Sequence, residues 1–156
     1  MSITSSAALK KFGAPGNAAT QGKYMKVWVV PADIRAAFSH VFFSALGQKG
    51  FPAKIFCNTL LIAPLEKALR NLIARGKASE MKTWDGCYIV RNARGLSSWS
   101  LHAWGLAIDV NAATNQLGKK PTLSAAFVKC FTDAGFEWGG PWSRPDGMHF
   151  QLKALP

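Results

Sequence analysis

Residues 105–111 (Gly-Leu-Ala-Ile-Asp-Val-Asn) alternate strictly between aliphatic side chains and small or polar ones. Successive side chains of a β-strand point to opposite faces, so Leu106, Ile108 and Val110 share one face and Asp109 lies on the other. The pattern predicts a strand whose aliphatic face packs on the core. Its other face carries one carboxylate beside glycine and alanine, which leave room for something to approach closely.

A second strand is predicted near the end of the chain, where three apolar residues alternate with two polar ones: Met148, Phe150 and Leu152 against His149 and Gln151. Asp146 stands between Pro145 and Gly147, so we expect it at a turn that leads into this strand. Both predicted strands therefore carry chemically active side chains on the face opposite the core.

The other local patterns mix strands and helices without a regular βαβ alternation, which predicts the α+β class. We expect strands over 26–30, 53–57 and 87–90, a turn at 85–86, a loop over 92–98 and helices over 33–47, 62–75 and 123–134. Pro64 is expected in the first turn of the middle helix. With 156 residues, the chain has the size of one domain, and we assign 26–156 to it and 1–25 to an N-terminal arm or lead-in.

The histidines and acids of these segments suit a zinc site. His102 precedes Asp109 by seven positions, an odd offset that would separate the two side chains in one straight strand. If the two share a ligand, His102 must lie on a loop or bulge before the strand, and Gly105 allows such a bend. Two imidazoles and one carboxylate with a fourth position open is the arrangement of catalytic zinc. The alternative is that the histidines are ordinary polar residues and that Asp109 caps a turn or pairs with a cation.

Three motifs together resemble the signature of a known family. In chain order they are Ser100-x-His102-x-x-Gly105-x-Ala107-x-Asp109, Trp138-Gly139-Gly140 and Asp146-x-x-His149. They are similar to the signature of the M15 metallopeptidases, which comprise D-alanyl-D-alanine carboxypeptidases and the L-alanyl-D-glutamate endopeptidases of phage endolysins. The resemblance implies zinc as cofactor, His102, Asp109 and His149 as its ligands, and Asp146 as catalytic acid/base. It also implies a small antiparallel sheet packed with helices, resembling the D-Ala-D-Ala metallopeptidase (Hedgehog-like) fold.

The same resemblance implies an arginine upstream of the first ligand that holds the substrate or the oxyanion. Arg91, at the end of the strand expected over 87–90, is our candidate, and Arg94 is the alternative; either could instead be a surface charge. Ser100 is expected to orient the first histidine or to cap the loop. Glu137 is a possible supporting carboxylate or a member of a strand-edge salt bridge.

The chain is strongly basic, because 19 Lys and Arg residues face eight Asp and Glu residues and give a net charge of +11. A polyanion is therefore the expected partner, and the spread of the charge without a recognisable motif argues against specific nucleic-acid binding. The charge agrees better with binding to an anionic cell wall or outer membrane. The resemblance to the M15 family implies the peptidoglycan stem peptide as the substrate. The three cysteines are expected to be reduced.

The resemblance to the M15 metallopeptidases, together with the charge, implies a zinc-dependent peptidoglycan peptidase. Our first expectation is an L-alanyl-D-glutamate endopeptidase acting as a phage or prophage endolysin, and our second a D-alanyl-D-alanine carboxypeptidase. A non-catalytic virion or wall-docking protein with the same fold, or a basic nucleic-acid-binding protein, are alternatives of other classes. No signal peptide or transmembrane segment is recognisable, so we expect a protein that is made in the host cytoplasm and acts at the cell wall or in the periplasm after release, or that is associated with the virion. We also expect a monomer.

Overall fold

The two segments with alternating sequence form neighbouring strands of one sheet, β6 (Ala107–Val110) and β8 (Asp146–Leu152). They run antiparallel, and their register pairs Ile108 with Phe150 and Asp109 with His149. Directly opposed residues of an antiparallel pair have their side chains on the same face. The aliphatic side chains therefore lie together on one face of the sheet, and the aspartate and histidine lie together on the other.

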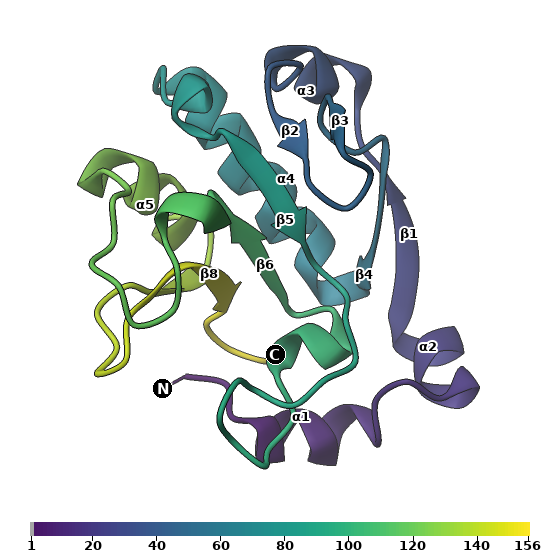
Figure 1. Ribbon diagram of the computed structural model, residues 1–156. Coiled ribbons are helices and arrows are strands. Elements are labelled where there is room, and N and C mark those ends of the chain that lie inside the picture. Colours follow the sequence, from purple (N-terminus) through teal and green to yellow (C-terminus); the bar gives the residue numbers. More distant parts are fainter. Residues whose placement is uncertain (1) are drawn as a thin grey trace.

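The computed structural model describes residues 2–156 and has an α+β architecture (Figure 1). The main sheet has the strand order β3-β2-β5-β6-β8-β7, and β1 and β4 form a separate pair. All paired strands are antiparallel except β2 and β5, which are parallel. The remaining strands are β1 (Met25–Val29), β2 (Phe42–Phe43), β3 (Gln48–Lys49), β4 (Lys54–Asn58), β5 (Thr83–Gly86) and β7 (Phe136–Gly139). The helices are α1 (Ser5–Phe12), α2 (Ala18–Tyr24), α3 (Ala32–Ala37), α4 (Thr59–Ala74) and α5 (Ala125–Thr132), with short 3₁₀ helices η1 (Ala78–Glu80), η2 (Leu101–Trp104) and η3 (Ala112–Thr114). The predicted α+β class is confirmed.

Helices α4 and α5 pack together and contribute to the same core as the apolar face of the sheet (Figure 1). The apolar stripe of α4 is buried, with Leu65, Leu69 and Leu72 completely inaccessible to solvent. On α5, Phe131 stacks on Phe150 of β8 with ring centroids 4.3 Å apart. Each such side chain contributes roughly 1.5–3 kcal/mol when fully buried. This packing holds β6 and β8 in place on the core and leaves the polar face of the two strands on the opposite side of the sheet.

Helix α4 begins at Thr59, three residues before the start that the sequence pattern predicts. The side chain of Asn58 accepts a hydrogen bond from the backbone N–H of Leu60, 3.0 Å away, and so caps the helix. The expectation for Pro64 is therefore wrong, because this residue lies inside the helix and not in its first turn.

Two other predictions of local structure are also wrong. The helix expected over 33–47 ends at Ala37, and the chain then forms β2, where the backbone N–H of Phe42 and of Ser44 donate to carbonyls beside and within β5. Pairing with a distant strand thus overrides the helical spacing of the apolar residues. The strand expected over 87–90 lies earlier, as β5, and includes the expected turn at 85–86. It ends at Gly86, whose φ of +134° directs the following residues out of the sheet.

The N-terminal segment forms two helices, of which α1 packs on η2 and α2 packs on β1. Ala8 and Phe12 of α1 are buried, and the indole N–H of Trp104 in η2 donates to the carbonyl of Gly13 over 2.9 Å. Helix α1 and the turn after it therefore lie directly against the motif segment. Within the part of the chain that the structure describes, no helix is long and apolar enough to cross a membrane.

Candidate metal centre

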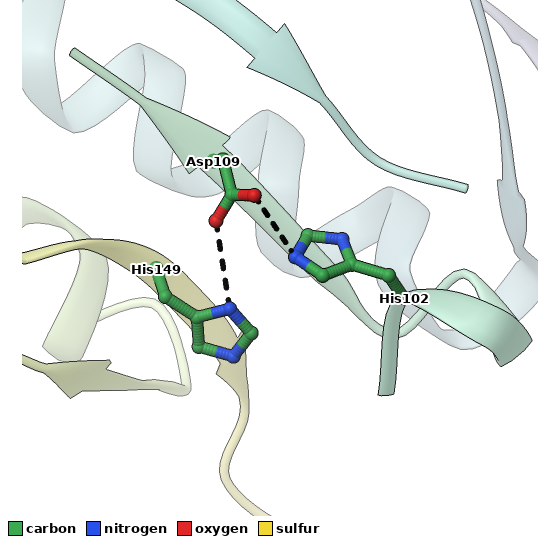
Figure 2. Close-up of side chains that lie close together, drawn as sticks. All are labelled: His102, Asp109 and His149. Carbon is green, nitrogen blue, oxygen red and sulfur yellow. Dashed lines mark ion pairs between the residues drawn. The ribbon is translucent and has the colours of Figure 1, made fainter. Parts of the chain in front are cut away.

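Three side chains from different parts of the chain converge on the polar face of the sheet (Figure 2). His102 comes from η2, Asp109 from β6 and His149 from β8. Asp109 Oδ2 lies 3.1 Å from His102 Nε2, and Asp109 Oδ1 lies 3.5 Å from His149 Nδ1. One donor atom from each residue lies within 4.8 Å of the others, so the three residues can hold one metal ion.

The turn before β6 places His102 on the same side as Asp109. The hydroxyl of Ser100 accepts a hydrogen bond from the backbone N–H of His102, 3.3 Å away, and so caps η2. Gly105 ends η2 with φ +64° and turns the chain into β6. A Cβ at this position would lie 2.6 Å from the backbone nitrogen of Asn58, so only glycine fits. The bend that the odd spacing predicted is confirmed.

In each imidazole, the nitrogen that points away from the cluster forms a hydrogen bond, and this bond shows which nitrogen carries the proton. His102 Nδ1 lies 2.6 Å from the backbone carbonyl of Cys87, which can only accept, so this nitrogen carries the proton and Nε2 presents a lone pair. His149 Nε2 lies 2.9 Å from the side-chain oxygen of Gln151 and donates to it, which leaves a lone pair on Nδ1. Both lone pairs are directed at the carboxylate of Asp109. Hydrogen bonds of this kind are typical of metal-binding histidines.

The donor set fits a cation on chemical grounds. A lone pair on nitrogen facing a carboxylate oxygen at 3.1 Å is repulsive unless a proton or a cation lies with them. His102 Nε2 and Asp109 Oδ1 are both buried and have no hydrogen-bond partner among residues 2–156. Buried polar atoms are nearly always paired, so two unpaired ones at the same point indicate a missing partner. Two neutral imidazoles and a carboxylate suit zinc.

The ionisable groups of the cluster are strongly coupled. Burial raises the pKa of Asp109, but the neighbouring imidazoles of His102 and His149 outweigh burial and bring this pKa well below its usual range. For His149, burial lowers the pKa, yet the neighbouring carboxylates of Asp109 and Asp146 outweigh it and leave the pKa raised. Asp109 is therefore ionised at every pH at which the protein would work.

Asp146 lies beside the cluster but has a different environment. Its Oδ2 is 4.0 Å from His149 Nδ1, and its side chain is partly exposed. Burial raises the pKa of Asp146 above the ordinary value, although the nearby His149 opposes the shift. Two neighbouring carboxylates whose pKa values are shifted in opposite directions are suited to different roles. Asp109 can bind a cation, and Asp146 can take up and release a proton.

A cavity of about 450 Å³ opens over the three clustered residues and Asp146. Arg91 and Arg94 both line it, together with Trp99 and Trp142. Arg91 lies on a loop and not at the end of a strand, which corrects the position that the sequence pattern suggested. Because both arginines reach the cavity, the geometry is compatible with either as the substrate-binding residue.

The structure separates the remaining candidates. Ser100 both caps η2 and lines the cavity. Glu137 forms no ion pair within the described chain; its carboxylate accepts hydrogen bonds from the hydroxyl of Ser2 and from the indole of Trp142. The sequence reasoning missed two residues of the site. Gln151 lies two residues from His149 and on the same face of the strand, so the alternating pattern already indicated that it could reach the site. Arg144 lines the cavity from the β7–β8 loop, and nothing in the local sequence indicates this position.

The fold and the cluster thus define a candidate metal site of the open, three-ligand type at the bottom of a cavity. Residues 94–152 match the family described as D-alanyl-D-alanine carboxypeptidase, and the match includes all three clustered residues and Asp146. The match supports membership of the M15 peptidase family and, with it, a peptidoglycan peptidase in general. No curated protein and no solved structure matches the chain.

Proposed function

We propose that this protein is a zinc-dependent peptidase that hydrolyses the peptide stem of peptidoglycan, with His102, Asp109 and His149 as zinc ligands. The observation that carries the proposal is the pair of buried, unpaired donor atoms, His102 Nε2 and Asp109 Oδ1, beneath a cavity that Asp146 also lines. The family match over 94–152 supports it independently.

Zinc bound by these residues would supply a Lewis acid that polarises the scissile carbonyl and lowers the pKa of water from about 15.7 to about 7. Asp146 accepts the proton of the attacking water and passes it to the leaving amine, a role that its raised pKa favours. Arg91 or Arg94, which both line the cavity, stabilises the substrate or the negative charge on the carbonyl oxygen. The hydrogen bonds from His102 to Cys87 and from His149 to Gln151 keep the two imidazoles in one orientation.

The bond between L-alanine and D-glutamate is our first candidate for cleavage, in the role of a phage or prophage endolysin. The motif resemblance includes the endopeptidases of that type, and the net charge of +11 would attract the protein to an anionic wall or outer membrane. The matched family, described as D-alanyl-D-alanine carboxypeptidase, favours the second candidate, hydrolysis of the terminal D-alanyl-D-alanine bond.

Digestion of purified peptidoglycan tests the proposal. The protein would be assayed as zinc-loaded enzyme, after chelation, and after zinc is added back, with metal content measured in each sample. We expect one zinc ion per chain, lysis products that begin with D-glutamate, and loss of activity that zinc restores. Release of free D-alanine without new stem N-termini would instead select the second candidate. A protein that binds no zinc and is unaffected by the chelator would refute the proposal.

A further inference from the structure

Three arginines surround the cavity without an acidic partner. Arg91, Arg94 and Arg144 all line it, and none takes part in an ion pair within the described residues 2–156. Among the described residues that line the cavity, Asp109 and Asp146 are the only acids. Since Asp109 is committed to the two imidazoles, positive charge is in excess around the cavity. Such a cavity favours an anionic ligand.

Arg144 is held in a defined place at this rim. Its Nη1 donates a hydrogen bond to the backbone carbonyl of Arg94 over 3.0 Å, which joins the β7–β8 loop to the loop that precedes η2. At Gly95 the chain has φ +77°, and a Cβ there would lie 3.0 Å from the same guanidinium nitrogen. The glycine therefore permits this close approach. The other N–H groups of the Arg144 guanidinium have no partner within the described chain and can bind a ligand.

Arg94 and Arg144 lie on the side of the cavity where Asp146 acts. Arg144 precedes Asp146 by two residues, its guanidinium is hydrogen-bonded to the backbone of Arg94, and all three residues line the cavity. In the proposed reaction Asp146 donates its proton to the leaving amine. The carbon that bears this amine also bears an α-carboxyl group. That group is a free carboxylate in D-glutamate linked through its γ-carboxyl and in a terminal D-alanine, whereas in an ordinary peptide it is an uncharged amide.

We propose that Arg144, together with Arg94, binds the free α-carboxylate of the amino acid that leaves. This inference rests on the proposed function and assigns to the site its substrate class: peptide bonds whose amine belongs to a residue with an unblocked α-carboxylate. A guanidinium binds a carboxylate through two parallel hydrogen bonds and gains little from an amide. Arg144 is thereby a specificity-determining residue that excludes ordinary α-linked peptides.

Two matched pairs of peptides test the proposal with zinc-loaded enzyme. The first pair contains the bond between L-alanine and the amine of a D-glutamate that continues through its γ-carboxyl group, with the α-carboxyl group either free or converted to the amide. The second pair ends in D-alanyl-D-alanine with a free or an amidated terminus. We expect kcat/KM to be about 10- to 100-fold higher for the free acid in one pair, and that pair identifies which carboxylate is bound.

Arg144→Ala should remove most of this preference by slowing cleavage of the acid while leaving cleavage of the amide nearly unchanged. Arg144→Lys keeps the charge but not the paired donors, so its preference for the acid over the amide should lie between those of the unmodified enzyme and of Arg144→Ala. Lys119→Ala is the matched control, because it removes an exposed cation that does not line the cavity. Equal cleavage of acid and amide by the unmodified enzyme, or an equal loss on both peptides in Arg144→Ala, would overturn the proposal.

Binding separates this inference from the proposed function. The same peptides would be titrated by calorimetry into zinc-loaded Asp146→Asn protein, with and without the change at Arg144. Tighter binding of the acid that depends on Arg144 supports the inference even if the unmodified enzyme cleaves no peptide. Such a lack of cleavage would refute the peptidase proposal alone. Equal binding of acid and amide would overturn the inference even if both are cleaved.

Discussion

Replacing Gln151 by leucine should weaken metal binding without touching a proposed ligand. Gln151 is 5% exposed, and its side-chain oxygen is 2.9 Å from His149 Nε2. Leucine has a similar size but no acceptor, so the imidazole N–H of His149 would be left buried and unpaired. Such a group costs about 1–3 kcal/mol of folding free energy. The ring would also lose the hydrogen bond that directs Nδ1 toward Asp109.

The expected loss of zinc affinity is about 10- to 100-fold, the usual effect of removing a hydrogen bond that orients a ligand. At zinc concentrations about 1,000 times the dissociation constant of the unmodified protein, bound zinc adds about 4.1 kcal/mol to its stability. A 100-fold weaker site under the same conditions would add only about 1.4 kcal/mol. For this 100-fold loss of affinity, at roughly 2–4 °C per kcal/mol, the zinc-dependent rise in Tm should shrink by about 5–11 °C.

Competition against a chromophoric zinc chelator would measure the affinity, and thermal unfolding with and without zinc would measure the stabilisation. Gln151→Glu keeps an acceptor oxygen and should bind zinc at least as well as the unmodified protein. Gln48→Leu, at an exposed position of β3, controls for the change of side chain itself. If Gln151→Leu binds zinc with unchanged affinity and shows the full rise in Tm, the hydrogen bond to Gln151 does not position His149.

Three further results are expected. Asp146→Asn should retain zinc but lower kcat by about 10²- to 10⁴-fold, as measured by metal content and peptide hydrolysis; loss of zinc as well would make Asp146 a ligand. Gly105→Ala should lower the free energy of unfolding by more than about 1 kcal/mol in a denaturant titration, because its Cβ would press on the backbone of Asn58 at a positive φ, and an unchanged midpoint would contradict this. In chelator, Tm should decrease as pH rises above the ordinary histidine pKa of 6.5, since the raised pKa of His149 stabilises the fold at lower pH and that stability is lost as the imidazole deprotonates. The part of Tm that depends on zinc should increase over the same range, because zinc binds the neutral imidazole; parallel curves with and without zinc would argue against the site.

Local pattern was a reliable guide wherever one face of an element is buried. The alternation around Asp109 and His149 predicted both strands, and the stripe through Leu65 and Leu69 predicted α4. In each case the apolar period matches the geometry of the element and the core confirms it. The same reasoning failed between residues 38 and 49, where a helical spacing of apolar residues ends up in short strands because β5 offers hydrogen-bond partners from a distant part of the chain.

The sequence by itself determined which side chains share a face with Asp109 and with His149, and it required a bend at Gly105 to bring His102 to that face. It also contained the motif by which the family can be recognised. The tertiary structure alone decided that Asp109 stands opposite His149, because the register of β6 and β8 depends on pairing between residues forty positions apart. It alone placed Arg144 against Arg94 at the rim of the cavity, because a contact between two loops leaves no period in the sequence of either one.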